Sequence, residues 1–312
     1  MIFPLIVIVG PTASGKSRLA IELASEWGTE IISADSRLIY KGMDIGTAKP
    51  TPFEFKGVKH HLIDIVNPDQ SFSVGDYKRN VDRVFLDHKE QGMSLPLILA
   101  GGTGLYVKSV LYGLWNGPPA DWAMRNFLMF QEEKSKGTLF RELMAADPQS
   151  AGRIHPNDLS KIIRALEVFH LTGKPLSYFH SEHQFQDRER PFLMIGIRTE
   201  RMELYRRIEA RADEMIKKGW IEEVECLMKN GYHDQLPAMH SLGYDLLCRF
   251  IKGSLSKNEA IQTIKKETRR YAKRQMTWFN KDPNVQWIDG NDPVRGAKQI
   301  MEAHCRGAVV GD

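Results

Sequence analysis

Cysteine is scarce in this chain, and its three residues, Cys226, Cys248 and Cys305, lie far apart. An odd number at such spacing fits neither a disulfide framework nor a zinc site. We therefore expect a reducing compartment, the cytoplasm, and no metal bound through cysteine.

Long apolar runs are also missing, since none approaches the ~20 residues that a membrane span needs. The apolar start is too short for a secretion signal, and no basic residues precede it. The 312 residues are 42% hydrophobic and 26% charged, which is typical of a soluble globular protein. We expect no membrane association, and nothing in the sequence indicates an obligate protein partner, so a monomer is compatible with it.

One segment near the start, GPTASGKS, matches the phosphate-binding pattern G-x-x-x-x-G-K-[ST]. An apolar run at 5–9 predicts a buried strand before it, and helical spacing of apolar residues predicts a helix after it. Backbone N–H groups at a helix start form an anion nest, to which Lys16 adds a charge and Ser17 a hydroxyl for Mg²⁺. The predicted phosphate-binding residues are Gly10, Pro11, Thr12, Ala13, Ser14, Gly15, Lys16 and Ser17. The pattern does not say which molecule carries the phosphate.

Strand and helix patterns alternate through the first hundred residues. Strands are predicted at 30–33 (EIIS), 58–66 (VKHHLIDIV) and 95–102 (LPLILAGG), and a helix at 74–92. Such alternation predicts an α/β fold, with a parallel sheet covered by helices on both faces.

The pattern changes at the Gly- and Pro-rich break NGPPADW, and no convincing strand follows until about residue 185. The run DLSKIIRALEVFHLTGKP predicts a helix with Asp158 as its N-cap and Gly173 and Pro175 as stop signals. We interpret 116–189 as an all-helical insertion between core segments 1–115 and 190–312. Within the second core segment, 191–199 (PFLMIGIRT) is predicted to return to the sheet, and 285–289 (VQWID) to form an edge strand.

Acidic residues are missing where a kinase of this fold usually holds Mg²⁺, because the strand predicted at 95–102 ends in LAGGTGLY. The second strand ends instead at Asp35, in ISADSRLIY. Strand ends open onto the ligand crevice of an α/β sheet. Asp35 could therefore be a metal ligand, a substrate anchor or a general base, and an Asx turn is the structural alternative.

The segment 265–281, KKETRRYAKRQMTWFNK, carries seven basic residues against one acidic residue. On a helix, the cations form two adjacent rows, and the aromatic residues Tyr271, Trp278 and Phe279 lie among them. Such an excess of cations indicates a candidate binding surface for a polyanion. The alternative is a solvated basic helix whose aromatic side chains face the core.

The stretches GPTASGKS, ISADSRLIYKGMDIGTAKP, HHLIDI, GGTGLY, RIHPNDLSKIIRALEVF, LGY and AKRQMTWF occur in this order along the chain. On these stretches the chain resembles the tRNA dimethylallyltransferases (tRNA isopentenyltransferases). The resemblance implies a P-loop kinase-like core with a helical insertion that contacts the tRNA anticodon arm. It also implies transfer of a dimethylallyl group from dimethylallyl diphosphate to the exocyclic amine of the adenine immediately 3′ of the anticodon. The phosphate loop would then hold the diphosphate, with Mg²⁺ bound to the diphosphate and Ser17.

The same resemblance implies roles for single residues. Asp35 would be the general base, Thr103 would contact the target nucleotide, and Arg211 would reach the diphosphate across the site. The tRNA contacts that it implies are Asp35, Ser36, Arg37, Leu38, Thr103, Arg125, Ser160, Lys161, Arg164, His240, Gly243, Tyr244, Lys273, Arg274, Gln275 and Trp278.

This chain departs from the family pattern at two places. Leu38 stands where the family usually has Gln, and His240 and Asp245 flank LGY where Arg or Gln and a basic residue are usual. We expect contacts at Leu38 and Asp245 to differ from the usual form.

Two other functions remain open from the residues alone. A small-molecule ATP kinase would use the same phosphate loop, although the missing acid and the basic C-terminal segment argue against it. A nucleotide-gated RNA-binding protein would need the loop but no catalytic base.

Overall fold

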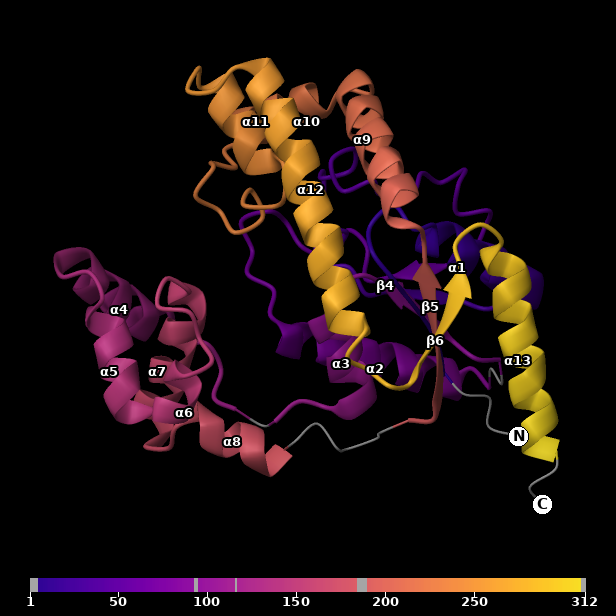
Figure 1. Cartoon of the computed structure of the whole chain (residues 1–312), viewed down its shortest axis with the longest axis horizontal. Helices are drawn as coiled ribbons and strands as arrows, with labels where there is room; N and C mark the ends of the chain where they lie inside the picture. The colour runs from indigo at the N-terminus through magenta and orange to yellow at the C-terminus, as the bar shows by residue number, and fades with distance from the viewer. Residues whose placement is uncertain (1–4, 93–94, 116, 184–189, 310–312) are drawn as a thin grey trace. The chain divides into compact units, whose positions relative to one another are not determined.

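A computed structural model describes residues 5–92, 95–115, 117–183 and 190–309. Contacts divide the chain into two compact units, one of residues 1–111 and 190–312 and the other of residues 112–189 (Figure 1). We call them the core unit and the inserted unit. No helix in the described ranges is both long enough and apolar enough to cross a lipid bilayer.

The core unit contains one sheet in which every strand pair is parallel. Its strands, in the order β3-β2-β4-β1-β5-β6, are His60–His61, Ile31–Ser33, Ile98–Gly101, Leu5–Val9, Phe192–Arg198 and Val285–Asp289. The central strand β1 is buried along its whole length, because neighbours pair with it on both sides and helices cover the sheet. The predicted parallel α/β fold is confirmed, including β5 and the edge strand β6.

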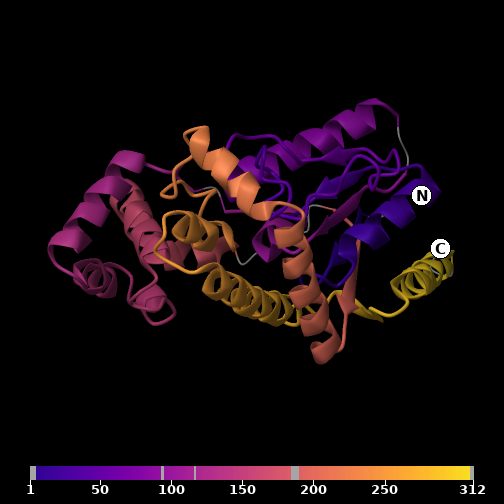
Figure 2. The same ribbon diagram turned by 90° about the horizontal axis from the view of Figure 1, so that it is seen from above.

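Helices cover this sheet on both faces. Helices α1 (Lys16–Trp27) and α13 (Pro293–Val309) pack against Ile6, Ile8 and their neighbours in β4, β5 and β6. Leu5, Val7 and Val9 point to the other face, since side chains alternate along a strand, and they are buried as well. Figures 1 and 2 show α2 (Val74–Glu90) and α3 (Gly104–Tyr112) on the other side of the sheet from α1 and α13.

The strand predicted at 58–66 is wrong for most of its length, because only His60 and His61 form β3. Leu62 and Asp64 adopt φ angles of 62° and 56°, in the left-handed region that an extended strand cannot include. The chain then makes a single parallel bridge between Val66 and Tyr40. The apolar pattern of this segment reflects burial in a loop rather than pairing in the sheet.

Four further helices of the core unit form a layer beyond the carboxyl ends of the strands. They are α9 (Arg201–Lys217), α10 (Trp220–Lys229), α11 (Tyr244–Ile251) and α12 (Lys257–Phe279). Figure 1 shows α12 running from α10 and α11 down to α3. A capping box between Ser256 and Glu259 starts α12, and Ala272 packs it against Leu204 and Ile208 of α9.

The described part of the inserted unit contains helices joined by loops and no strand. Its helices are α4 (Trp122–Lys134), α5 (Thr138–Ala146), α6 (Pro148–Ala151), α7 (Leu159–Thr172) and α8 (Leu176–His183). They surround their own apolar core, centred on Leu143, Ile162 and Leu166. The predicted ends of α7 are confirmed, because Asp158 caps the N-terminus and Gly173, with φ 70°, follows the last turn.

Candidate active site

The phosphate loop, residues 10–17, joins β1 to α1 as predicted. Gly15 has φ 96° and forms the N-cap, so Lys16 is the first residue of α1. The ammonium of Lys16 donates a hydrogen bond to the carbonyl of Pro11, at 2.7 Å. Burial lowers the pKa of Lys16 to about 8; the Asp35 carboxylate opposes this shift, and the Arg211 guanidinium adds to it. The loop thus faces Asp35 and Arg211, two of the three residues to which the resemblance gives roles in catalysis.

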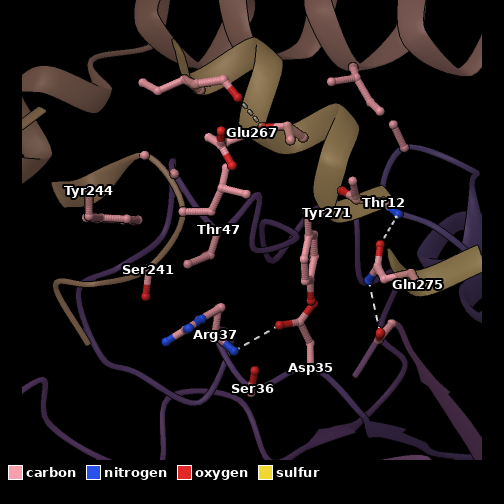
Figure 3. A pocket seen from close by; sticks show the side chains of 18 of the residues that line it. Thr12, Asp35, Ser36, Arg37, Thr47, Ser241, Tyr244, Glu267, Tyr271 and Gln275 are labelled. Carbon is pink, nitrogen blue, oxygen red and sulfur yellow. Dashed lines mark hydrogen bonds between the residues drawn. The ribbon is translucent and has the colours of Figure 1, made fainter. Parts of the chain in front are cut away.

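Asp35 lies just beyond β2, in a turn of its own. Its Oδ1 accepts a hydrogen bond from the amide of Arg37 at 2.8 Å, which is the Asx turn that the sequence left open (Figure 3). The hydrogen bond of this turn uses Oδ1 of the carboxylate and does not involve Oδ2. Thr103, beyond β4, lies beside it: its amide donates to the carbonyl of Ala34, and its hydroxyl accepts from the amide of Ser36. The ends of β2 and β4 are therefore joined around Asp35.

Two cavities meet at this point. The first, of about 1100 Å³, is lined by the phosphate loop, Leu38 and the segment from Pro50 to Glu54. The second, of about 640 Å³, is lined by Thr103 and its neighbours, residues 240–246 and one side of α12. We call them the loop cavity and the helix cavity. The residues that line both are Thr12, Ala13, Asp35, Thr47, Arg211, Met215, Tyr271 and Gln275.

Arg211 reaches this shared wall from α9. Burial lowers the pKa of its guanidinium, and the carboxylates of Asp35, Glu214 and Glu54 oppose that shift. Arg211 and Lys16 together give the shared wall a positive character on the side of the phosphate loop. The structure therefore brings together Asp35, Thr103, Arg211 and the loop, as the resemblance implied.

Helix α12 contributes the opposite part of the helix cavity. Tyr271, Arg274, Gln275 and Trp278 line it, and Trp278 is 47% exposed. Burial raises the pKa of Tyr271 to about 12, and the Asp35 charge contributes. Phe279, by contrast, is a core residue with 2% exposure. A basic helix whose aromatic side chains face the core was the alternative to an RNA-binding surface. Phe279 does face the core, whereas Trp278 does not.

A family model described as "IPP transferase" matches residues 38–282. The chain belongs to the IPP transferase family. It is 48% identical over 286 residues to "tRNA dimethylallyltransferase 2" of Geotalea uraniireducens, covering 91% of this chain and 92% of the relative. It is 47% identical over 287 residues to "tRNA dimethylallyltransferase" of Geobacter sulfurreducens, covering 91% of each.

Solved structures of IPP transferases agree with this assignment. The tRNA isopentenylpyrophosphate transferase of Bacillus halodurans superimposes with a TM-score of 0.69 at 40% identity, over 98% of this chain and 95% of the other. A eukaryotic dimethylallyltransferase described as acting on tRNA superimposes with a TM-score of 0.75 at 25% identity, over 92% of this chain and 73% of the other. The predicted P-loop transferase fold is confirmed by both.

Three residues predicted to contact tRNA, Tyr244, Leu38 and Gln275, are buried or lie in the loop cavity. Tyr244 is fully buried, and its hydroxyl donates to Glu223 at 2.6 Å. The Glu223 carboxylate also accepts from the amides of Asp44, Ile45 and Gly46, which fixes the loop leading to Thr47. Leu38 lines the loop cavity, and Gln275 is 6% exposed. His240, Arg274 and Trp278 remain open on the wall of the helix cavity.

Sequence reasoning did not identify Glu223. It is one of several acidic residues of an amphipathic helix, and its partners lie far away in sequence. Nothing local distinguishes it from a solvated Glu.

In the inserted unit, two predicted RNA contacts share one carboxylate. Arg125 forms two hydrogen bonds of 2.8 Å with Glu167, whose side chain is fully buried, and Arg164 pairs with the same group. Lys161 pairs with Asp158, and Ser160 is exposed. The side chains of Arg125 and Arg164 are 26% and 30% exposed. Contact of these residues with RNA stays a prediction.

Proposed function

We propose that this chain is a tRNA dimethylallyltransferase. It transfers a dimethylallyl group from dimethylallyl diphosphate to the exocyclic amine of the adenine immediately 3′ of the anticodon, and pyrophosphate is released. The observation that carries this proposal is the place of Asp35 on the wall common to two cavities. A donor held by the phosphate loop and a nucleotide that enters along α12 would meet at its carboxylate.

The loop cavity suits a diphosphate that leaves rather than one that transfers phosphate. The bond between the prenyl carbon and the diphosphate oxygen breaks, and its electron pair stays with the oxygen. Lys16, Arg211 and the amides at the start of α1 surround the region where that negative charge grows. Donors fixed in advance stabilise such charge more in the transition state than in the ground state.

Magnesium fits this site as a partner of the diphosphate. Among the described residues, no three His, Cys, Asp or Glu side chains cluster to hold a metal. Mg²⁺ prefers oxygen ligands and is commonly bound through substrate phosphates, with several waters retained. Ser17, exposed in the loop cavity, is the residue that would hold it. When bound, Mg²⁺ neutralises part of the leaving-group charge.

The acceptor amine needs a base, because its lone pair is delocalised into the adenine ring. The amine nitrogen forms the new bond to the prenyl carbon, and one of its protons passes to Asp35. The Asx turn supports this role, because the amide of Arg37 fixes Oδ1 and so orients the carboxylate. Thr103 holds the adjoining turn and would border the target nucleotide.

Binding of tRNA would use the cations of α12 that have no acidic partner in the described part of the chain. Within the basic segment 265–279 of that helix these are Lys266, Lys273 and Arg274. Trp278 offers a partly exposed indole at the same helix, on which a base can stack. Arg125, Ser160, Lys161 and Arg164 of the inserted unit would contact the anticodon arm.

Incubation of the protein with labelled dimethylallyl diphosphate and bulk tRNA tests the proposal directly. We expect label in RNA and an equal amount of pyrophosphate, and neither with Asp35→Asn over the same time. ADP formation from ATP with any acceptor would favour the kinase instead. Tight RNA binding without transfer, unaffected by Asp35→Asn, would favour the binding protein.

A further inference from the structure

The side chain of Gln275 joins α12 to two loops of the sheet. Its Oε1 accepts a hydrogen bond from the amide of Thr12 at 2.8 Å. Its Nε2 donates to the carbonyl of Gly102 at 3.0 Å. Figure 3 shows the carboxamide between the phosphate loop and the turn after β4. With 6% exposure, Gln275 has both ends of its amide engaged inside the protein.

The space around this carboxamide is closed from the side of the sheet. A Cβ atom on Gly102 would lie 2.1 Å from Nε2 of Gln275, so only glycine allows this approach. One helical turn away, Ala272 of α12 packs with Leu204 and Ile208, and Ala13 of the phosphate loop packs against the same cluster. The loop is thus held against α12 by one apolar contact and one hydrogen bond.

We propose that Gln275 is a positioning residue for the donor diphosphate, and that it does not contact tRNA. This inference rests on the function proposed above. Thr12 and Ala13 line both cavities and precede the amides that would bind the diphosphate. Gln275 fixes the backbone of this part of the loop and therefore the direction of the following N–H groups. The neighbours Lys273 and Arg274 are exposed and remain available to RNA.

Removal of the carboxamide leaves the amide of Thr12 and the carbonyl of Gly102 without these partners. In Gln275→Met, which preserves the length of the side chain, the phosphate loop loses its hydrogen bond to α12 and keeps only the apolar contact of Ala13. We expect weaker binding of inorganic pyrophosphate with Mg²⁺, by roughly threefold to tenfold, because each lost hydrogen bond contributes modestly. Affinity for tRNA should stay within about twofold, and its salt dependence should not change.

The matched control is Lys273→Ala, two residues away on the exposed side of α12. It should weaken tRNA binding and leave pyrophosphate binding unchanged, which is the reverse of Gln275→Met. Calorimetric titration with pyrophosphate and a tRNA binding assay supply the two readouts, and neither needs turnover. Transfer by the wild-type protein is measured separately, so failure of the proposed function is distinguished from failure of this inference.

Two further variants separate positioning from simple stability. Gly102→Ala acts from the opposite side, since its new methyl group displaces the carboxamide, and should reproduce the loss of pyrophosphate affinity. In Gln275→Glu, a protonated carboxyl can replace both hydrogen bonds, whereas a carboxylate repels the Gly102 carbonyl. Its pyrophosphate affinity relative to wild type should therefore fall as pH rises.

Loss of tRNA affinity with normal pyrophosphate binding in Gln275→Met would overturn the inference and make Gln275 an RNA contact. A lower melting temperature with both affinities unchanged would overturn it in favour of a purely structural role.

Discussion

Lys265 of α12 donates to a carboxylate oxygen of Asp213 on α9, at 2.8 Å. Arg269, one turn further along α12, pairs with Glu209, which also lies on α9. These two cations of the basic segment hold α9 and α12 together instead of facing a polyanion. Lys266, Lys273 and Arg274 lie on α12 outside this pairing, so the helix separates its structural charges from those free to meet RNA.

This separation predicts different salt dependences. Each phosphate neutralised releases condensed counterions. Replacing Lys266, Lys273 or Arg274 by Ala should therefore flatten the plot of log tRNA affinity against log salt by up to ~1 unit for a duplex contact. Lys265→Ala is the control: it should leave the slope alone and cost about 0.2–1 kcal/mol of unfolding free energy, since its partner Asp213 lies at the surface. Unchanged slopes for all three test variants would remove α12 from the RNA interface.

Trp278→Ala should weaken tRNA binding without altering the salt slope. Trp278 lines the helix cavity and is 47% exposed, and stacking of a base on an aromatic ring contributes roughly 1–3 kcal/mol. The neighbouring Phe279, 2% exposed, is the matched comparison, and Phe279→Ala should instead cost about 3–5 kcal/mol of stability. Melting curves beside binding isotherms separate the two. A large stability loss with normal RNA binding in Trp278→Ala would contradict the stacking role.

Asp35→Asn should slow prenyl transfer by ~10²- to 10⁴-fold, the usual effect of losing a general base. The amide oxygen of Asn can still accept from Arg37, so the Asx turn and tRNA affinity should be preserved. Single-turnover rates with saturating donor measure the effect. Near-normal turnover would exclude Asp35 as the base.

Pyrophosphate affinity should depend on pH through Lys16. In the free protein its pKa is about 8, lowered chiefly by burial, and a bound anion raises it. The protonated form binds better, so affinity is fully present below about pH 8. It falls by up to tenfold per unit as pH rises from there to the pKa of the complex.

Lys16→Ala should bind pyrophosphate more weakly and lose this pH dependence, which calorimetry between pH 7 and 9.5 can measure. ATP should compete weakly at most and should never donate phosphate. An identical pH profile in Lys16→Ala would assign the titration to another group.

The sequence predicts those parts of the fold in which local pattern and burial coincide. Strand β1 and the phosphate loop are examples, and so is α7 with its caps. The edge strand β3 was overestimated, because the left-handed conformation of Leu62 cannot be inferred from an apolar run.

In the site, Asp35 and the loop follow from strand ends and motif, whereas the partners of Gln275 and Glu223 do not. Their hydrogen bonds join segments far apart in sequence, such as Thr12 with Gln275. Helical periodicity tells which face a side chain occupies but not what lies opposite. Burial of Glu167 beneath Arg125 and Arg164 could not be predicted either, because Arg125 lies on another helix.

Arg190 marks the place where the chain returns to the core unit. Its guanidinium pairs with Asp82 of α2 at 2.7 Å and lies 4.3 Å from the ring centre of Phe85. It also donates to the carbonyl of Val110, near the point where the chain leaves the same unit. The chain therefore leaves the core unit and returns to it at neighbouring positions, on either side of the inserted unit. Replacing the inserted unit by a short loop would leave the pairing of every strand in the sheet unchanged, because the sheet and the inserted helices pack around separate apolar cores.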